Sequence, residues 1–284
     1  AGKEADLIVF ETMTDLAEIK AGVLAAKENS NKPILCTMTF EENMRTFTGC
    51  CISSMAITLE GLGVDAIGAN CSLGPKQLRP IVDKLLKSSS LPVMLKPNAG
   101  LPKIIDGKTV YDINVDEFAD EVLSAINSGV RIVGGCCGTT PEYIRKVSQK
   151  TIGAKPIDIK EKNITCVSSY THVVEFGKQP ILIGERINPT GKKRFKQALI
   201  EHDIDYILNE GINQQEKGVH ILDVNVGLPE IDEPELLKTA VCELQAIINL
   251  PLQIDTSDIK AMESALRVYN GKAMINSVNG KQES

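Results

Sequence analysis

The chain has 284 residues, of which 43% are hydrophobic and 24% are charged, and its formal net charge is −6. This composition is typical of a globular protein and lacks the clustered Lys and Arg that a nucleic-acid groove requires. No apolar run approaches the ~20 residues of a membrane span, and no secretory signal is visible. We therefore expect a cytoplasmic protein whose eight cysteines are reduced thiols rather than disulfides, with no membrane or nucleic-acid partner.

Short apolar runs rich in Val and Ile recur through the first half, and each is followed by Gly, Asn, Pro or Ser. They predict strands over residues 7–11, 33–39, 66–70, 93–97 and 131–135. Helical patterns are predicted between them, among others over residues 15–29, 75–88 and 115–128. Continuous apolar strands indicate burial on both faces, which is typical of a parallel sheet covered by helices.

Residues 151–178 have scattered Lys, Pro, Ser and Thr without a clear period, and they predict a linker with one short strand near 165–167. Strands are expected again over residues 181–187, 221–226, 252–255 and 273–276.

Repeated β/α units without a Gly-rich dinucleotide motif suggest TIM-type barrels, which close with eight strands. Neither half has eight. We therefore expect an α/β fold of two incomplete TIM-type (β/α)8 barrels joined by a linker, with both chain ends as cuts. The expected domains are 1–150, a linker over 151–178, and 179–284. A single doubly wound sheet is the alternative, but a linker of this length argues against it.

Three cysteines follow predicted strands, where the functional residues of such barrels lie. Cys71 follows one strand, and Cys136 and Cys137 follow another. Adjacent residues of a regular strand point to opposite faces, so the backbone must leave strand geometry for both thiols to reach one ion. Nearby glycines permit this. Three thiolates leave the fourth tetrahedral position open, which is typical of a catalytic zinc site.

The alternative is that these are small buried cysteines that only pack. Adjacent cysteines arise easily, as Cys50 and Cys51 in the same chain illustrate. We assign no role to that pair, and we expect Cys36, Cys166 and Cys242 to be packing residues.

The motifs around the three cysteines resemble a known family. Gly-Ala-Asn-Cys-Ser-Leu-Gly-Pro, Pro-Asn-Ala-Gly and Gly-Gly-Cys-Cys-Gly-Thr-Thr-Pro occur in this order at 68–75, 97–100 and 134–141. They resemble the homocysteine-binding module of cobalamin-dependent methionine synthases. The resemblance implies that Cys71, Cys136 and Cys137 bind zinc and activate the substrate thiol. It also implies that Glu11, in a strand ending Glu-Thr, contacts the homocysteine amine, although Glu11 is also explained as a polar residue at a strand mouth.

The second half resembles the methyltetrahydrofolate-binding module of the same family. The similar segments are Ile-Gly-Glu-Arg-Ile-Asn-Pro-Thr-Gly at 183–191 and the strand ends at 223–227, 255–257 and 274–277. The resemblance implies that Asn188, Asp255 and Asn276 hydrogen-bond the pterin, whose edge alternates donors and acceptors. Asp223 and Asn225 are expected to brace the loop, and the basic turn 192–194 to be solvated or to attract the folate tail.

The implied reaction makes methionine from homocysteine. The methyl group passes from 5-methyltetrahydrofolate through cobalamin, which a module outside this chain binds, to a zinc-bound homocysteine thiolate. A further reactivation module is implied, and the chain alone is expected to be inactive. The alternatives are a cobalamin-independent homocysteine S-methyltransferase that uses betaine or S-methylmethionine, a zinc barrel paired with a folate reductase, and a non-catalytic zinc-storage protein. The folate-like second half argues against the first two.

Overall fold

The structure, a computed structural model, describes residues 4–278. The chain forms two compact units, Ala1–Asn163 (unit 1) and Ile164–Ser284 (unit 2), each of which is described by itself. Among the described residues, no helix has the length and apolar character needed to cross a membrane.

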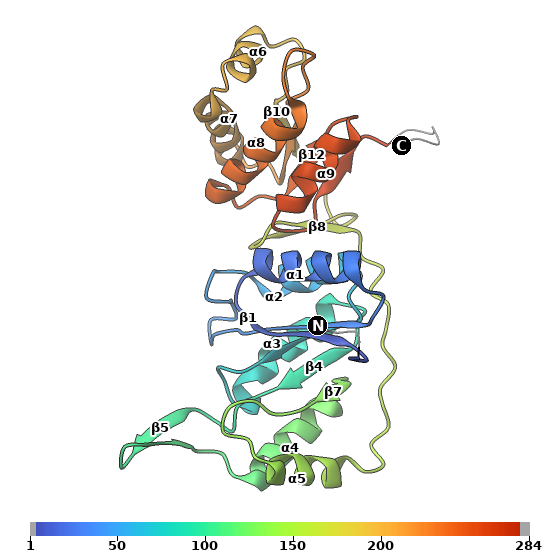
Figure 1. Cartoon of the computed structure of the whole chain (residues 1–284), viewed down its shortest axis with the longest axis vertical. Coiled ribbons are helices and arrows are strands. Elements are labelled where there is room, and N and C mark those ends of the chain that lie inside the picture. The colour runs from blue at the N-terminus through green and yellow to red at the C-terminus, as the bar shows by residue number, and fades with distance from the viewer. Residues whose placement is uncertain (1–3, 279–284) are drawn as a thin grey trace. The chain divides into compact units, whose positions relative to one another are not determined.

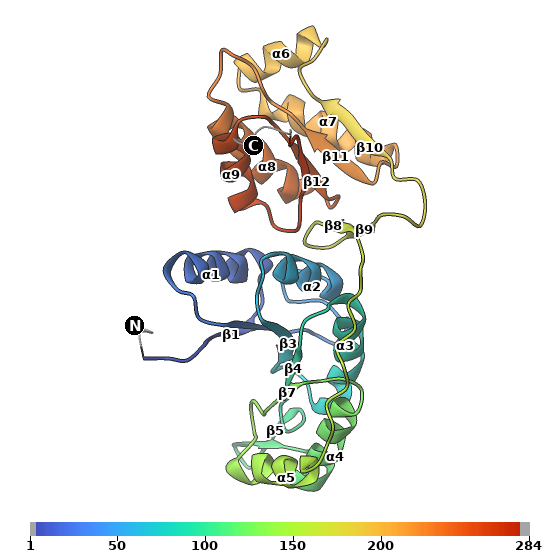
Figure 2. The same cartoon turned by 90° about the vertical axis from the view of Figure 1, so that its right-hand side faces the viewer.

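Unit 1 alternates strands and helices as its apolar runs predict. Its helices lie along one side of its strands (Figure 2). Its elements are β1 (Ile8–Met13), α1 (Leu16–Asn29), β2 (Ile34–Met38), α2 (Ile52–Gly61), β3 (Ala66–Asn70), α3 (Pro75–Ser88), β4 (Val93–Lys96), β5 (Pro102–Ile105), β6 (Lys108–Tyr111), α4 (Val115–Ile126), β7 (Ile132–Val133) and α5 (Pro141–Thr151).

The main sheet of unit 1 has the order β1-β2-β3-β4-β7, and all its strand pairs are parallel (Figure 1). The central strand β3 is buried along its whole length. Gly68 in β3 permits a close approach to β4, because a Cβ atom there would lie 2.2 Å from the Met94 carbonyl oxygen. A parallel sheet brings the carboxyl ends of its strands to one edge. The segments that carry the three cysteines therefore leave the sheet at the same edge, on either side of β4.

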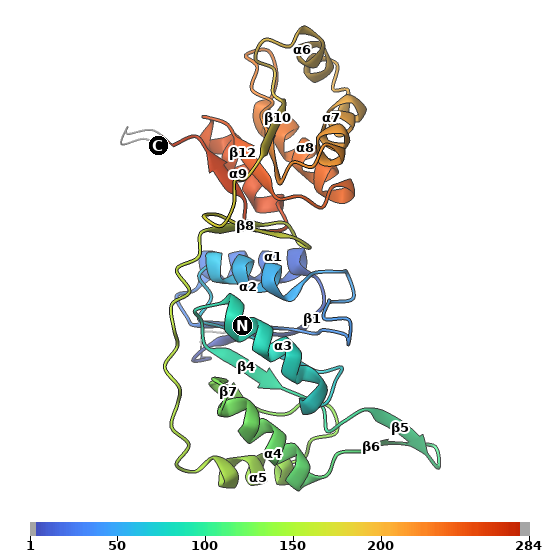
Figure 3. The ribbon, with the colours of Figure 1, turned by 180° about the vertical axis from the view of Figure 1, so that it is seen from behind.

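A two-stranded antiparallel hairpin, β5–β6, interrupts the β/α pattern between β4 and α4. It extends away from the rest of unit 1 (Figure 3), and Ile104 near its tip is 81% exposed. The sequence reading did not include this hairpin. The Asp106-Gly107 pair between two β-branched runs is the signal that predicts it, because both residues adopt the positive φ that tight hairpin turns require.

Unit 2 has a four-stranded parallel sheet of order β10-β11-β12-β13 and a separate hairpin, β8–β9. The sequence predicted a single short strand where this hairpin lies. The elements of unit 2 are β8 (Cys166–Ser168), β9 (Val173–Glu175), β10 (Ile183–Ile187), α6 (Lys193–Ile200), α7 (Ile204–Glu216), β11 (Ile221–Val224), α8 (Glu233–Ile247), β12 (Leu252–Asp255), α9 (Ile259–Val268) and β13 (Met274–Asn276).

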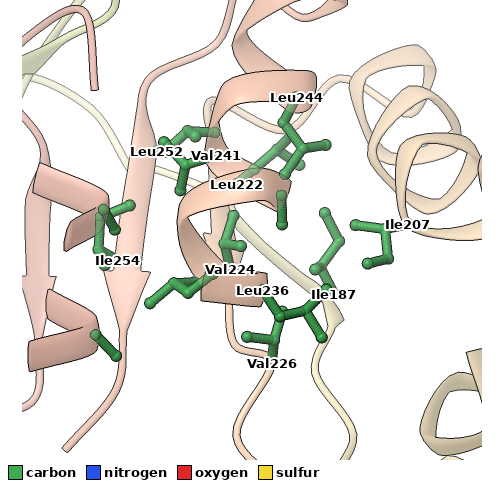
Figure 4. Packing of buried hydrophobic residues seen from close by; sticks show 14 of the residues in the cluster. Ile187, Ile207, Leu222, Val224, Val226, Leu236, Val241, Leu244, Leu252 and Ile254 are labelled. Carbon is green, nitrogen blue, oxygen red and sulfur yellow. The ribbon is translucent and has the colours of Figure 1, made fainter. Parts of the chain in front are cut away.

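The core of unit 2 lies between α8 and the strands β11 and β12 (Figure 4). Leu244 of α8, Leu222 of β11 and Ile254 of β12 are completely buried in this cluster. Each buried leucine or isoleucine contributes about 1.5–3 kcal/mol relative to an exposed one. This packing holds the strands whose carboxyl ends carry Asp223 and Asp255.

Tyr269 fastens the β8–β9 hairpin to the sheet of unit 2. Its side chain is 1% exposed, and its hydroxyl donates to the Ser168 carbonyl at 2.9 Å. The same hydroxyl accepts a hydrogen bond from the Leu252 amide at 3.0 Å. A single buried oxygen thus satisfies one backbone group of β8 and one of β12.

We expect Tyr269→Phe to destabilise unit 2 by about 1–3 kcal/mol, because two buried backbone groups lose their partner. Urea unfolding of the full chain, followed by circular dichroism, measures this loss. Tyr170→Phe is the matched control, because the Tyr170 hydroxyl makes only a longer, 3.4 Å contact with Asn249 at the surface. Equal unfolding midpoints for the two variants would contradict the role given to Tyr269.

Candidate metal centre

Cys71 lies immediately after β3, where the chain turns out of the sheet. Cys71 and Ser72 adopt positive φ values of 63° and 57°. The Cys71 amide still donates to the Lys96 carbonyl at 3.1 Å, which continues the ladder between β3 and β4 by one bond. The ladder therefore fixes the position of the Cys71 backbone, while the left-handed turn directs the chain away from the sheet.

Cys136 and Cys137 follow β7, which is only two residues long. The Cys136 amide donates to the Pro97 carbonyl at 2.8 Å, and its carbonyl accepts from the Thr139 hydroxyl at 2.7 Å. Gly138 then adopts a φ of +79°, which favours glycine. The backbone thus leaves strand geometry before the cysteine pair, as the sequence requires if both thiols are to face one point.

The three sulfur atoms of Cys71, Cys136 and Cys137 lie within 4.8 Å of one another. The Sγ atoms of Cys71 and Cys137 are 3.7 Å apart. Four sulfurs arranged tetrahedrally at about 2.3 Å from zinc are roughly 3.8 Å from each other. The donor set and its spacing therefore fit a zinc ion with three protein thiolates.

The pKa of Cys71 is raised to about 11, chiefly by burial and also by the neighbouring Cys136 and Cys137 sulfurs, while a hydrogen bond with the Ser72 backbone opposes the rise. The Cys71 thiol therefore resists ionisation when no opposite charge is near. A cation at their centre supplies the opposite charge that the cluster needs.

Asn70 supports the cluster from inside the sheet, and sequence reasoning missed it. Its side chain is completely buried. Its Oδ1 atom accepts from the Thr12 amide at 2.9 Å and the Thr37 hydroxyl at 2.7 Å, and its Nδ2 atom donates to the Thr12 hydroxyl at 2.7 Å. The Nδ2 atom also lies 3.9 Å from the Cys136 sulfur. A polar residue in an otherwise apolar buried strand is the signal that could have found it.

Glu11 lies in β1 at the mouth of the same site. Its carboxylate forms an ion pair with the ammonium group of Lys96, which ends β4. The aliphatic part of Lys96 lies against Gly134. The residue predicted to contact the substrate amine therefore already faces a cation of the protein, which the sequence did not indicate.

The other cysteines lie elsewhere. Cys51 caps the amino end of α2, where its sulfur accepts from the Ser54 amide at 3.4 Å. Cys36 and Cys50 are completely buried, and burial raises the pKa of Cys36 to about 12. Cys166 lies in β8 and Cys242 in α8.

The predicted pterin residues of unit 2 gather at the carboxyl ends of its strands. Asp255 and Asn276 are register partners at the ends of β12 and β13. Asp255 Oδ2 accepts from the Asn225 side-chain amide at 3.0 Å. Asp223, buried at the end of β11, accepts from the Gln253 side chain. The sheet thus brings a carboxylate and two amides together at one edge.

Asn188 follows β10 at the same edge of the sheet. Its Oδ1 atom accepts from the Thr190 amide at 2.9 Å, and its Nδ2 atom lies 3.4 Å from a Glu185 carboxylate oxygen. The ammonium group of Lys192, which the sequence left as a solvated turn or a binder of the folate tail, donates to the Glu185 carbonyl at 2.8 Å. Lys192 therefore braces the loop that carries Asn188.

Comparisons with known proteins identify relatives of both halves of the chain. Residues 184–284 match the family of pterin binding enzymes. Methionine synthase of Mycobacterium leprae is 32% identical over 97% of this chain, and methionine synthase of Mycobacterium tuberculosis is also 32% identical over 97%. The chain spans 24% of the length of each relative. The resemblance of both halves to modules of this enzyme is thereby confirmed.

Among solved structures, the apo form of a homocysteine methyltransferase from Escherichia coli is 24% identical, covering 52% of this chain and 50% of that chain with a TM-score of 0.44. Residues 1–151 match the family described as homocysteine S-methyltransferase. This match takes in 151 of the 284 residues, and the chain therefore belongs to the homocysteine S-methyltransferase family.

Proposed function

We propose that this chain supplies the thiol-activating site and part of the pterin site of a methyltransferase that makes methionine from homocysteine. The observation that carries the proposal is the group of three cysteine sulfurs at two strand ends, all within 4.8 Å of one another. The match of residues 184–284 to pterin binding enzymes supports 5-methyltetrahydrofolate as the methyl donor. Because the chain spans 24% of its relatives' length, other parts of such an enzyme are expected on further modules.

Cys71, Cys136 and Cys137 would hold a zinc ion through their thiolates. Zinc bound there lowers the pKa of a substrate thiol and keeps its sulfur nucleophilic near neutral pH. The protein contributes the geometry, since the Lys96 and Pro97 carbonyls accept hydrogen bonds from the backbone amides of Cys71 and Cys136, respectively. The open fourth position is the place for the sulfur of homocysteine.

Glu11 and Lys96 would orient the substrate. The Glu11 carboxylate can pair with the ammonium group of an amino acid, but it pairs with Lys96 in this structure. Substrate binding would then exchange one ion pair for another. Because the Glu11 side chain is 51% exposed, solvent screens the pair and the exchange has a low electrostatic cost.

Each sheet would form part of a TIM-type barrel, with domains at 1–150 and 179–284 and a linker between them. The outermost strands support this arrangement. Val9 of β1 is 41% exposed and Ile275 of β13 is 50% exposed. Apolar edge strands are normally covered or paired, and further strands of a closed barrel would do both.

Asn188, Asp255 and Asn276 would hold the pterin in unit 2. A carboxylate accepts two N–H bonds from a pterin edge, and the amides supply both donors and acceptors. The Asn225 side-chain amide donates to Asp255 Oδ2, and Asn225 Oδ1 accepts from the Gly227 amide at 2.9 Å. Cobalamin on a separate module would carry the methyl group between the two sites. A betaine or S-methylmethionine enzyme would not need the pterin-like unit, so this unit disfavours that alternative.

Asp223 has a different role in this proposal, which is to brace the floor of the pterin site. Burial raises its pKa to about 6, and the nearby carboxylates of Asp255 and Glu185 add to this, while hydrogen bonds from Gln253 and Asn276 oppose it. The buried side chain spans from β11 to β12 rather than reaching outward.

The zinc site predicts a change in sulfur coordination. X-ray absorption of the zinc-loaded chain should show three sulfurs at about 2.3 Å, and four after homocysteine is added. Replacing Cys71, Cys136 and Cys137 together by Ala should abolish zinc uptake. The control replaces Cys51 and Cys242 by Ala and should bind zinc normally. Zinc that persists in the triple variant would show that the site lies elsewhere.

Asp255→Ala should weaken binding of 5-methyltetrahydrofolate about tenfold to a hundredfold, because a charged hydrogen-bond acceptor is lost. Calorimetric titration measures the dissociation constant. Asp205→Ala, which removes an exposed aspartate from the first turn of α7, is the control and should bind like the original chain. Unchanged affinity in Asp255→Ala would remove Asp255 from the pocket.

The stability of the Asp223→Asn variant, relative to that of the original chain, should increase as the pH rises. The folded-state pKa of about 6 exceeds the ordinary aspartate value of 3.8, so the folded state binds more protons between these two pH values. The free energy of unfolding due to Asp223 therefore falls as pH rises through this window, by about 3 kcal/mol. Urea unfolding of both proteins at pH 4 and pH 8 tests this, with Asp205→Asn as the control. A stability difference that does not change with pH would contradict it.

A further inference from the structure

We propose that residues 97–113, which include the β5–β6 hairpin, clamp Cys137 and that the Tyr111 hydroxyl donates a hydrogen bond to the Cys137 sulfur. Tyr111 would thus be a positioning residue that acts on the metal through this ligand. The inference rests on the proposed zinc site, and it extends to residues 101–113, to which the sequence motifs give no role.

The clamp holds the backbone of Cys137 on both sides. The Cys137 amide donates to the Asn98 side-chain oxygen at 3.0 Å, and the Cys137 carbonyl accepts from the Ala99 amide at 2.9 Å. Asn98 is 4% exposed and Ala99 is completely buried. Asn98 and Ala99 therefore hold the peptide groups on both sides of Cys137.

Tyr111 completes the clamp at the side chain. Its ring lies against Gly138, where an added Cβ atom would come within 2.3 Å of the ring. Gly138 directly follows Cys137, so this contact places the phenol group beside the Cys137 sulfur, which acts on the Tyr111 hydroxyl. A tyrosine hydroxyl carries its proton near neutral pH and can therefore donate it.

The base of the hairpin is held while its tip is free in solvent. Asp112 Oδ1 accepts from the Leu101 amide at 3.1 Å, and its other oxygen pairs with Lys103 at 3.0 Å. The Ile113 amide donates to the Ala99 carbonyl at 3.0 Å. These bonds join the two ends of the hairpin segment, so the backbone of Tyr111 is held close to the cysteines.

Cys137 is the one exposed member of the three cysteines, so its side chain has the most freedom to rotate. A donor aimed at its sulfur restricts that rotation and withdraws charge from the thiolate. Hydrogen bonds to a metal-ligating atom typically change metal affinity by about 10–100-fold. The clamp therefore orients Cys137, which is the most exposed of the three cysteines.

The test uses the full 284-residue chain with cobalt(II) as a spectroscopic probe and zinc competition against a chelator. Tyr111→Phe removes only the hydroxyl. We expect the thiolate-to-cobalt charge-transfer band to move to lower energy and zinc affinity to fall about tenfold. Tyr170→Phe is the control, because the Tyr170 hydroxyl lies 3.4 Å from the Asn249 side chain in unit 2 and touches no residue of the clamp. It should leave the band in place.

A double-mutant cycle separates positioning from a purely structural effect. In a Cys137→Ala background, Tyr111→Phe should have no further effect on the band or on affinity, because its target sulfur is gone. Equal losses with and without Cys137 would overturn the inference, as would an unchanged band in Tyr111→Phe. If the original chain takes up neither metal, the proposed zinc site fails and the inference falls with it.

Discussion

The backbone ladder between β3, β4 and β7 determines where the three cysteines can lie. Leu95 of β4 pairs with Ala69 on one side and Val133 on the other, so both cysteine segments leave the sheet next to the same strand. The ladder then extends past the strands, through bonds to the Lys96 and Pro97 carbonyls. Because parallel strands end at a common edge, residues 66 positions apart in sequence bring their sulfurs to 3.7 Å.

The same rule organises unit 2, but with oxygen and nitrogen atoms in place of sulfur. Asp255 and Asn276 are neighbours because their strands are in register, and Asn225 reaches Asp255 from the next strand. Asp223 illustrates the cost of this arrangement, since a carboxylate buried at a strand end is harder to ionise. One architecture therefore gathers sulfur atoms at the sheet edge of unit 1 and hydrogen-bonding groups at the sheet edge of unit 2.

Much of the fold could be predicted because continuous apolar runs identify buried parallel strands. The run at 221–226, for example, predicted a strand, and the structure has β11 there. The motifs likewise located Cys71, Cys136 and Cys137. Asn70 and Lys96 were missed because their roles depend on contacts across strands, to Thr12 and Glu11 respectively, which no local pattern encodes. Tyr111 was not singled out for the same reason, since a hairpin and not sequence spacing brings its ring against Gly138, the residue after Cys137.

The long separation of Cys71 from Cys137 also bears on how unit 1 folds. Between them lie α3, β4, the β5–β6 hairpin, α4 and β7. An ion that joins the two cysteines would close this loop as a cross-link does. With the loop ends 66 positions apart, the chain entropy removed from the unfolded state is on the order of 4 kcal/mol. Half of the sheet would then owe part of its cohesion to the metal, so that the ion which serves chemistry also serves folding.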